Sequence, residues 1–253
     1  MLILMMGAGK GLENGVTAGF GAWATNSMFL WTQSTSMPYK GFQRGRRFNL
    51  YNEDVDALRN EIPELDLICP RNQLGGYRGS NNVIRGNKTG PFNIYGDVPD
   101  YFKLERRTLL AGRILNEEDI KEKRKVCVIG KRVHETLFEA DENPIGDNIR
   151  VNGVYFKVIG VYDTKRKGED GDEDLQSVIM PLSTFQQTFN YGNIVGWFSI
   201  SAKENHSIQA LQSQVFAVLK KRHSINPEDD RAFGSWNLEE EYVKMKGLFI
   251  GIN

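Results

Sequence analysis

The chain has 253 residues, of which 40% are hydrophobic and 25% are charged, and these values suit a globular protein of one or two domains. Its 32 basic residues balance its 32 acidic residues. Because no positive charge is in excess, the composition disfavours binding to nucleic acid or to an anionic membrane surface.

Both ends of the sequence are apolar. Residues 1–6 and 247–252 are much shorter than the roughly 20 residues that cross a bilayer, and the first run lacks the basic leader of a signal peptide. The two runs fit either terminal strands of a soluble protein or a segment cut out between two membrane helices. Between them, residues 10–25 place apolar side chains at helical spacing, which predicts a helix: Leu12, Val16, Phe20 and Trp23.

The first third of the chain predicts a strand followed by a strand–helix–strand unit. Residues 27–43 favour extended structure, and residues 46–50 are expected to form the first strand of the unit. Asn52 is the expected N-cap of a helix that ends before Pro63, with Val55, Leu58 and Ile62 on one face. A second strand covers residues 65–69 and stops at Pro70. Residues 71–90 predict a loop or twisted hairpin.

The middle of the chain predicts another strand, a short helix and a hairpin. Residues 126–129 form an apolar run closed by Gly130, as in a strand buried on both faces, and the helix that follows ends before Pro144. Asn152-Gly153 favours a type I′ turn between two strands. An aliphatic strand, residues 178–181, ends in Pro181, and residues 164–174 are expected to form an exposed, mobile loop.

A second strand–helix–strand unit is predicted near the C-terminus. Residues 195–202 are β-like, residues 207–221 carry a long apolar helical stripe with basic residues at its end, and residues 232–236 fit a returning strand.

We expect no catalytic site, cofactor or metal in this chain. His134, His206 and His223 lack partners at the spacing of a zinc site, and the acidic residues 169–174 lack the ligand pattern of a calcium-binding EF-hand loop. Phosphate-binding and serine-nucleophile motifs are also missing from the sequence. A hydrolase that uses Glu118 and Asp119 has no supporting constellation.

Other conspicuous residues have ordinary structural interpretations. Cys69 and Cys127 lie in apolar stretches and are expected to be buried free thiols rather than a disulfide. The tryptophans are expected to pack in the core instead of lining a ligand cavity: Trp23, Trp31, Trp197 and Trp236. The basic residues 121–125 fit a charged loop better than a docking site for an acidic partner.

The order of several short motifs between residues 109 and 181 resembles the periplasmic core domain of MacB-like (FtsX-like) ABC transporter permeases. The motifs are Gly112-Arg113, Glu118-Asp119, residues 126–130, Leu137-Phe138, residues 144–146, residues 156–161 and residues 178–181. We call eight of these positions the signature residues and expect them to be structural: Gly112, Arg113, Asp119, Gly130, Pro144, Gly146, Gly160 and Pro181. Arg113 is expected to pair with Asp119 and fix the loop before the strand at Val126.

The resemblance implies an α+β fold with a discontinuous, porter-like β-α-β subdomain and an inserted, mainly-β (Sabre-like) subdomain. Residues 1–44 would form a membrane-proximal stalk and leading strand. Residues 45–97 and 195–240 would form the porter-like subdomain, residues 98–194 the insertion, and residues 241–253 the return to a membrane helix.

The resemblance also implies a function and partners. The domain would lie on the periplasmic side of the inner membrane, between two transmembrane helices, and relay ATP-driven movement to export of a drug, peptide or lipoprotein. Its partners would be a second permease copy, a cytoplasmic ABC ATPase and either a periplasmic adaptor with an outer-membrane channel or a lipoprotein carrier. The alternative is a stand-alone periplasmic or surface module that binds a ligand or mediates adhesion without transport.

Overall fold

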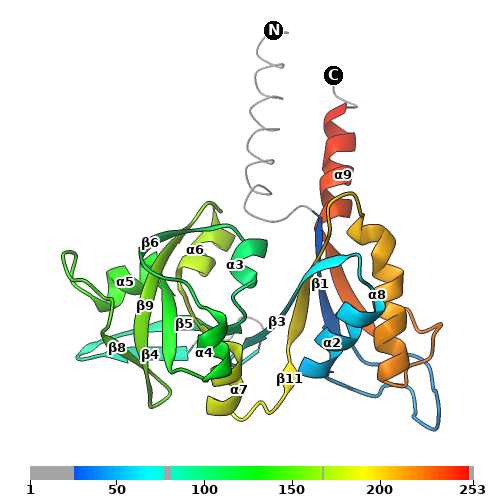
Figure 1. Ribbon diagram of the computed structural model, residues 1–253, viewed down its shortest axis with the longest axis horizontal. Coiled ribbons are helices and arrows are strands. Elements are labelled where there is room, and N and C mark those ends of the chain that lie inside the picture. The colour runs from blue at the N-terminus through cyan, green and yellow to red at the C-terminus, as the bar shows by residue number, and fades with distance from the viewer. Residues whose placement is uncertain (1–25, 77–80, 167, 251–253) are drawn as a thin grey trace.

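The computed structural model describes residues 26–76, 81–166 and 168–250, with no side-chain description for residues 245–250. Two lobes lie side by side, as Figure 1 shows. One large mixed sheet runs through both lobes in the order β10-β7-β9-β8-β4-β5-β3-β12-β1-β13, and β6 pairs with β9 beside this path. The α+β fold that was expected is confirmed.

The first lobe is an antiparallel sheet covered on one face by two helices. Its strands are β1 (Ser27–Thr32), β3 (Leu65–Gln73), β12 (Trp197–Ala202) and β13 (Phe233–Asn237). Helices α2 (Asn52–Glu61) and α8 (Ile208–Arg222) cover the sheet face to which Met28 and Leu30 point, and all contribute to one hydrophobic cluster. Strand β1 lies between β12 and β13, so the first and last strands of the described chain are neighbours. Helix α9 (Leu238–Ile250) follows β13 directly.

The start of the first strand–helix–strand unit differs from the prediction in two ways. The strand expected over residues 46–50 is reduced to β2 (Leu50–Tyr51), which pairs with β11 (Ile194–Val195). Arg46 instead donates to the carbonyl of Ser224, and its backbone N–H donates to Thr35 Oγ1. The helix N-cap is Tyr51 rather than Asn52, because the Asp54 carboxylate accepts the Tyr51 N–H at 2.9 Å.

Strand β3 does not stop at Pro70, as the sequence suggested, but continues to Gln73. Pro70 faces Phe198 of β12, whereas β5 joins the other side of β3 only through Asn72 and Gln73. A proline is tolerated where its missing N–H is not required by a second ladder. Strand β3 therefore extends beyond the first lobe and connects it to the second.

The second lobe is a closed ring of six strands. These are β4 (Asn81–Arg85), β5 (Lys88–Asp97), β7 (Val126–Gly130), β8 (Asn148–Val151), β9 (Val154–Thr164) and β10 (Ser177–Pro181). The parallel pairing of β10 with β5 closes the ring. Strand β6 (Arg107–Gly112) pairs with the C-terminal half of β9. Within the stretch expected to be a loop or twisted hairpin, residues 81–90 form a hairpin between β4 and β5.

The predicted hairpin of this lobe is present, as is the short helix expected after Gly130, and four further short helices were not predicted. Asn152 and Gly153 connect β8 to β9 with φ values of +45° and +86°, as a type I′ turn requires. The short helices are α3 (Tyr101–Leu104), α4 (Glu117–Lys121), α5 (Lys131–Leu137), α6 (Glu169–Leu175) and α7 (Leu182–Thr188). Residues 164–174 were expected to be an exposed loop, but they contain most of α6, and Asp174 is buried at 7% exposure.

The core residues fall into two main clusters. The first combines residues from 28–68 with residues from 195–233, as a discontinuous subdomain would. The second includes Leu74, Val83, Phe92 and Ile94, together with residues from β7 to α7. The division of the chain at residues 97 and 195 stays a prediction, although β4 and β5 pack with the second cluster. No helix among the described residues is long and apolar enough to span a membrane.

Candidate functional site

The signature residues all lie in or beside the second lobe, and several make close backbone contacts. Gly112 and Gly160 face each other across β6 and β9. A Cβ atom at Gly112 would lie 2.1 Å from the Ile159 carbonyl oxygen, and one at Gly160 would lie 2.2 Å from the Arg113 oxygen. Any side chain at either position would therefore push the two strands apart. Gly130 ends β7, Pro144 and Gly146 lie in the turn before β8, and Pro181 ends β10.

Arg113 and Asp119 form the expected ion pair. The guanidinium donates to both carboxylate oxygens at 2.6 and 3.0 Å, and the fully buried Asp119 also accepts the backbone N–H of Asn116 at 3.0 Å. Asn116 in turn caps α4 by accepting the Asp119 N–H. Burial opposes ionisation of Asp119, but the hydrogen bonds from Arg113 and Asn116 outweigh it and lower the pKa of this carboxyl. The arrangement has the geometry of a structural clamp.

A buried charged cluster lies near the junction of β3 and β5, and sequence reasoning did not find it. Arg107 contacts Glu105 at 2.6 Å and Asp174 at 2.7 Å, and all three side chains are at most 5% exposed. Burial raises the pKa of Glu105, whereas Arg107 outweighs the effect of burial at Asp174 and lowers its pKa. Arg166 completes the cluster by contacting Glu105 at 3.3 Å.

A second buried ion pair extends this cluster toward the first lobe. Arg71 of β3 lies 2.8 Å from Asp97 of β5, with side-chain exposures of 7% and 0%. The Arg71 guanidinium is enclosed by aromatic rings, 3.8 Å from the centre of Tyr95 and 4.1 Å from that of Tyr101. Burial raises the pKa of Asp97, although Arg71 opposes this effect. Because Arg71 and Asp97 come from the strands that join the lobes, their pairing ties the lobes together.

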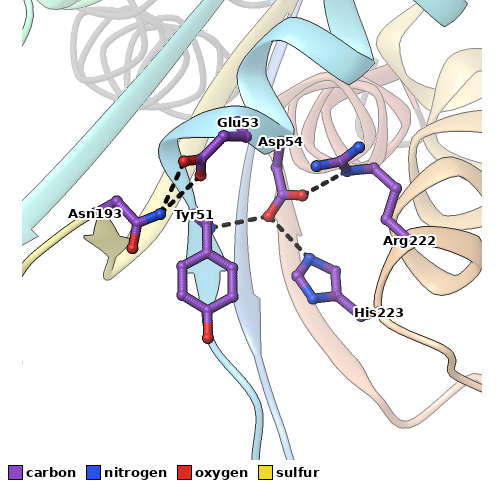
Figure 2. Close-up of a pocket in the computed structure, with 6 residues that line it drawn as sticks. All are labelled: Tyr51, Glu53, Asp54, Asn193, Arg222 and His223. Carbon is purple, nitrogen blue, oxygen red and sulfur yellow. Dashed lines mark hydrogen bonds and ion pairs between the residues drawn. The ribbon is translucent and has the colours of Figure 1, made fainter.

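A pocket of about 330 Å³ lies between the start of α2 and the end of α8 (Figure 2). Within it, the buried Asp54 carboxylate contacts Arg222 Nε at 2.7 Å and His223 Nε2 at 2.8 Å. Burial raises the pKa of Asp54, but the hydrogen bonds from His223 and Arg222 outweigh it and lower this pKa overall. Glu53 accepts two contacts from Asn193 at the pocket edge.

The pocket in Figure 2 has an acid–histidine pair but lacks the other parts of a hydrolytic site. The described residues that line it include no serine, threonine or cysteine that His223 could activate. The Asp54 contacts are internal: the Tyr51 N–H caps α2, and Arg222 and His223 connect α2 to the end of α8. We therefore assign the Asp54 group a structural role in the first lobe.

The remaining candidate residues are dispersed. His134 and His206 contact backbone carbonyls in separate parts of the chain. Among the described residues, no three histidine, cysteine or carboxylate side chains are grouped so that they could hold a metal ion. Cys69 and Cys127 are free and fully buried, as predicted, and burial raises the pKa of both thiols.

The tryptophans do not all pack in the core, so that prediction is wrong for two of them. Trp31 and Trp236 are 38% and 42% exposed. Strand alternation explains this result, because Met28 and Leu30 face the helices and leave Trp31 on the opposite face of the sheet. Trp236 stacks on Phe29 on that same face, with ring centres 5.6 Å apart. Trp23 lies outside the described residues, as does the helix expected over residues 10–25.

Comparison with known proteins identifies a family model and several relatives. A model described as the MacB-like periplasmic core domain matches residues 1–218. The chain is 29% identical over 186 residues to the macrolide export ATP-binding/permease protein MacB of Syntrophobacter fumaroxidans, covering 73% of this chain and 25% of that protein. It is 24% identical over 224 residues to the pyoverdine export ATP-binding/permease protein PvdT of Pseudomonas putida, covering 88% and 32%. The chain thus spans about a third or less of these relatives.

Two solved structures show the same fold. The periplasmic region of MacB from Actinobacillus actinomycetemcomitans superposes with a TM-score of 0.69 at 22% identity, covering 90% of this chain and 95% of that one. The extracellular domain of the ABC-type transporter YknZ from Gram-positive bacteria gives a TM-score of 0.67 at 16% identity, covering 84% and 100%.

Proposed function

Because the chain belongs to the family of MacB-like periplasmic core domains, we propose that it works as the extracytoplasmic part of an ABC transporter permease. It lies on the periplasmic side of the bacterial inner membrane, between two transmembrane helices. Its task is to relay ATP-driven movement of those helices to the export of a periplasmic substrate, such as a drug, a peptide or a lipoprotein.

The family membership carries this proposal, and the position of β1 supports it. Strand β1 pairs with β13, and α9 leaves the first lobe directly after β13 (Figure 1). The start of β1 and the start of α9 therefore lie next to each other on the first lobe. A domain with adjacent connections can be carried between neighbouring membrane helices without distortion of its fold.

The proposed relay requires partners outside this chain. We assign ATP hydrolysis to a separate nucleotide-binding domain or subunit, because the match with this chain covers only 25–32% of the relatives named as ATP-binding/permease proteins. A second permease copy would complete the transporter. A periplasmic adaptor with an outer-membrane channel, or a lipoprotein carrier, would receive the substrate.

Thiol labelling of the full-length protein tests the proposed location. Tyr155 is 60% exposed, so Tyr155→Cys offers a reactive thiol, whereas the native Cys69 and Cys127 are fully buried. We expect a membrane-impermeant maleimide to label Tyr155→Cys in intact spheroplasts more strongly than the parent protein, whose Cys69 and Cys127 are buried. Labelling that appears only after the membrane is permeabilised would rule out a periplasmic location.

Distance measurements test the relay itself. A spin label at Tyr155→Cys in each copy of the reconstituted transporter reports the separation of the two outer domains. We expect this separation to differ between the nucleotide-free and ATP-trapped states. An unchanged distance, in a preparation whose ATPase is active, would contradict the relay while leaving the location intact. A protein with only one membrane connection would instead favour the stand-alone module.

A further inference from the structure

A polar cleft of about 580 Å³ lies on the seam between the lobes, and we call it the seam cleft. Its volume falls within the range of ordinary ligand sites. Its lining residues come mainly from α7 and the start of α2. Helix α7 lies at the end of the molecule opposite α9 (Figure 1). Its lining side chains are amides, one hydroxyl and one ammonium: Asn52, Lys123, Ser183, Gln186, Gln187 and Asn190.

The floor of the seam cleft is fixed by hydrogen bonds between the lobes. The Asn52 and Gln186 side chains donate to each other at 3.0 Å, and Gln186 also donates to the Ile194 carbonyl at 3.0 Å. Gln186 is only 5% exposed. The Ser183 hydroxyl donates to the Ile120 carbonyl and thereby holds α7 against α4. The floor is therefore preorganised before any ligand arrives.

The rim of the seam cleft consists of exposed side chains that remain available. Lys123, Gln187 and Asn190 are exposed, and within the described ranges their side chains form no hydrogen bond or ion pair with the rest of the chain. Lys123 supplies the single charge of the lining. The neighbouring Glu122 is paired with Arg124 at 2.8 Å and lies outside the lining. The lining of the cleft thus carries one positive charge, although the whole chain has no net charge.

We propose that the seam cleft binds an extended peptide segment that carries a carboxylate. Lys123 pairs with the carboxylate, and the amides of Gln187 and Asn190 bond the peptide backbone. An amide side chain has one acceptor and an NH₂ donor group, and it therefore matches the alternating N–H and C=O groups of an extended chain. The lining has no aromatic or aliphatic side chain, which disfavours a lipid or an aromatic small molecule.

The partner is then a protein with an acidic, extended segment. This inference goes beyond the proposed relay and does not depend on it, since binding is measured on the chain alone. Because the cleft takes residues from both lobes, an occupied cleft would also add contacts across the seam.

The backbone at Lys123 provides a variant that removes the charge without strain. Lys123 has φ of +50°, directly after the end of α4, where glycine or asparagine is usual. Lys123→Asn therefore keeps a suitable backbone and loses only the ammonium. Lys121→Asn is the matched control, because Lys121 is exposed in the last turn of α4 but does not line the cleft.

Peptide titration followed by amide NMR on the full chain tests the proposal. The probe is acetyl-Gly-Gly-Asp-Gly-Gly-amide, compared with the same peptide containing asparagine and with acetate alone. We expect the aspartate peptide to shift cleft resonances with millimolar affinity, and the asparagine peptide to bind about two- to fivefold more weakly, as for loss of an exposed ion pair. Lys123→Asn should weaken binding of the aspartate peptide by the same factor, and Lys121→Asn should leave its affinity unchanged.

Three outcomes would overturn the inference. The first is an absence of shifts at the cleft in the folded parent protein. The second is equal binding of the aspartate and asparagine peptides. The third is an acetate response equal to that of the aspartate peptide, which would reduce the cleft to a simple anion site. A melting temperature of Lys123→Asn equal to that of the parent protein verifies that the fold of the variant is intact.

Discussion

Replacing Arg107 with methionine should destabilise the chain strongly, because it leaves Asp174 buried without its cation and leaves Glu105 with only the longer contact from Arg166. Both carboxylates lie within 2.7 Å of Arg107 and are at most 5% exposed. Removing one partner from a buried ion pair costs about 3–5 kcal/mol. At roughly 2–4 °C per kcal/mol for a domain of this size, the melting temperature should fall by about 6–20 °C.

Differential scanning fluorimetry across pH tests this prediction and its cause. Without Arg107, burial raises the folded-state pKa of both carboxyls above their unfolded values, so the variant regains stability as pH falls and loses it as pH rises. The deficit should thus be smaller at pH 5 than at pH 8. A control is Arg132→Met, because Arg132 pairs with Glu135 at the surface and is 55% exposed. It should change stability by less than about 1 kcal/mol.

A neutral version of the cluster separates the charge effect from lost packing. The triple variant Arg107→Met, Glu105→Gln and Asp174→Asn removes the three most deeply buried charges, and Arg166 keeps its ion pair with Asp170 at 3.2 Å. We expect it to be more stable than Arg107→Met at pH 8. A single variant that melts within about 2 °C of the parent, or a triple variant less stable than the single one, would refute the electrostatic argument.

Three further predictions concern single residues. Arg113→Ala removes two hydrogen bonds to the buried Asp119 and should cost about 1.5–3 kcal/mol in urea unfolding without changing partner affinity; an unchanged midpoint would count against the clamp. The pKa of Asp54 is lower in the folded than in the unfolded state, so its contribution to folding stability is full above the unfolded pKa and is lost as pH falls through the folded pKa. Asp54→Asn should therefore lose less stability on acidification than the parent protein does. If the stability of variant and parent fell in parallel with pH, this role of Asp54 would be disproved. Gly160→Ala should destabilise by more than about 2 kcal/mol, since its Cβ would lie 2.2 Å from a backbone oxygen, whereas Gly153→Ala meets no atom within 4 Å and reports only the strain of its positive φ.

Local patterns in the sequence predicted much of the fold. The Asn152-Gly153 turn, the apolar run that became β7, and the periodic stripe of α8 each depend on neighbouring residues, and each is present. The predictions that failed depend on tertiary context. Pro70 lies within a strand because β5 joins β3 only beyond it, and Trp31 is exposed because it lies on the sheet face opposite α2 and α8.

The buried charged cluster could not be predicted from local sequence. Arg107 and Asp174 lie far apart in the chain and come together only when β6 and α6 pack against β9. Asp174 belongs to an acidic run that is typical of an exposed loop. It is buried because it lies at the C-terminal end of α6. The seam cleft was missed for the same reason, since Asn52 and Gln186 meet across two separate lobes.

The pairing of β1 has a consequence for the order in which the chain folds during synthesis. Ser27 pairs with Ser201 and Met28 with Asn237, so β1 has no native partner until residues 197–202 have been made. The ring of β4 to β10 is complete once residue 181 has emerged. Because domains fold as units while the chain is synthesised, the second lobe should form first. The backbone N–H and C=O groups of β1 and β3 that pair with β12 would stay unpaired until then. The slow step of folding would be this long-range pairing.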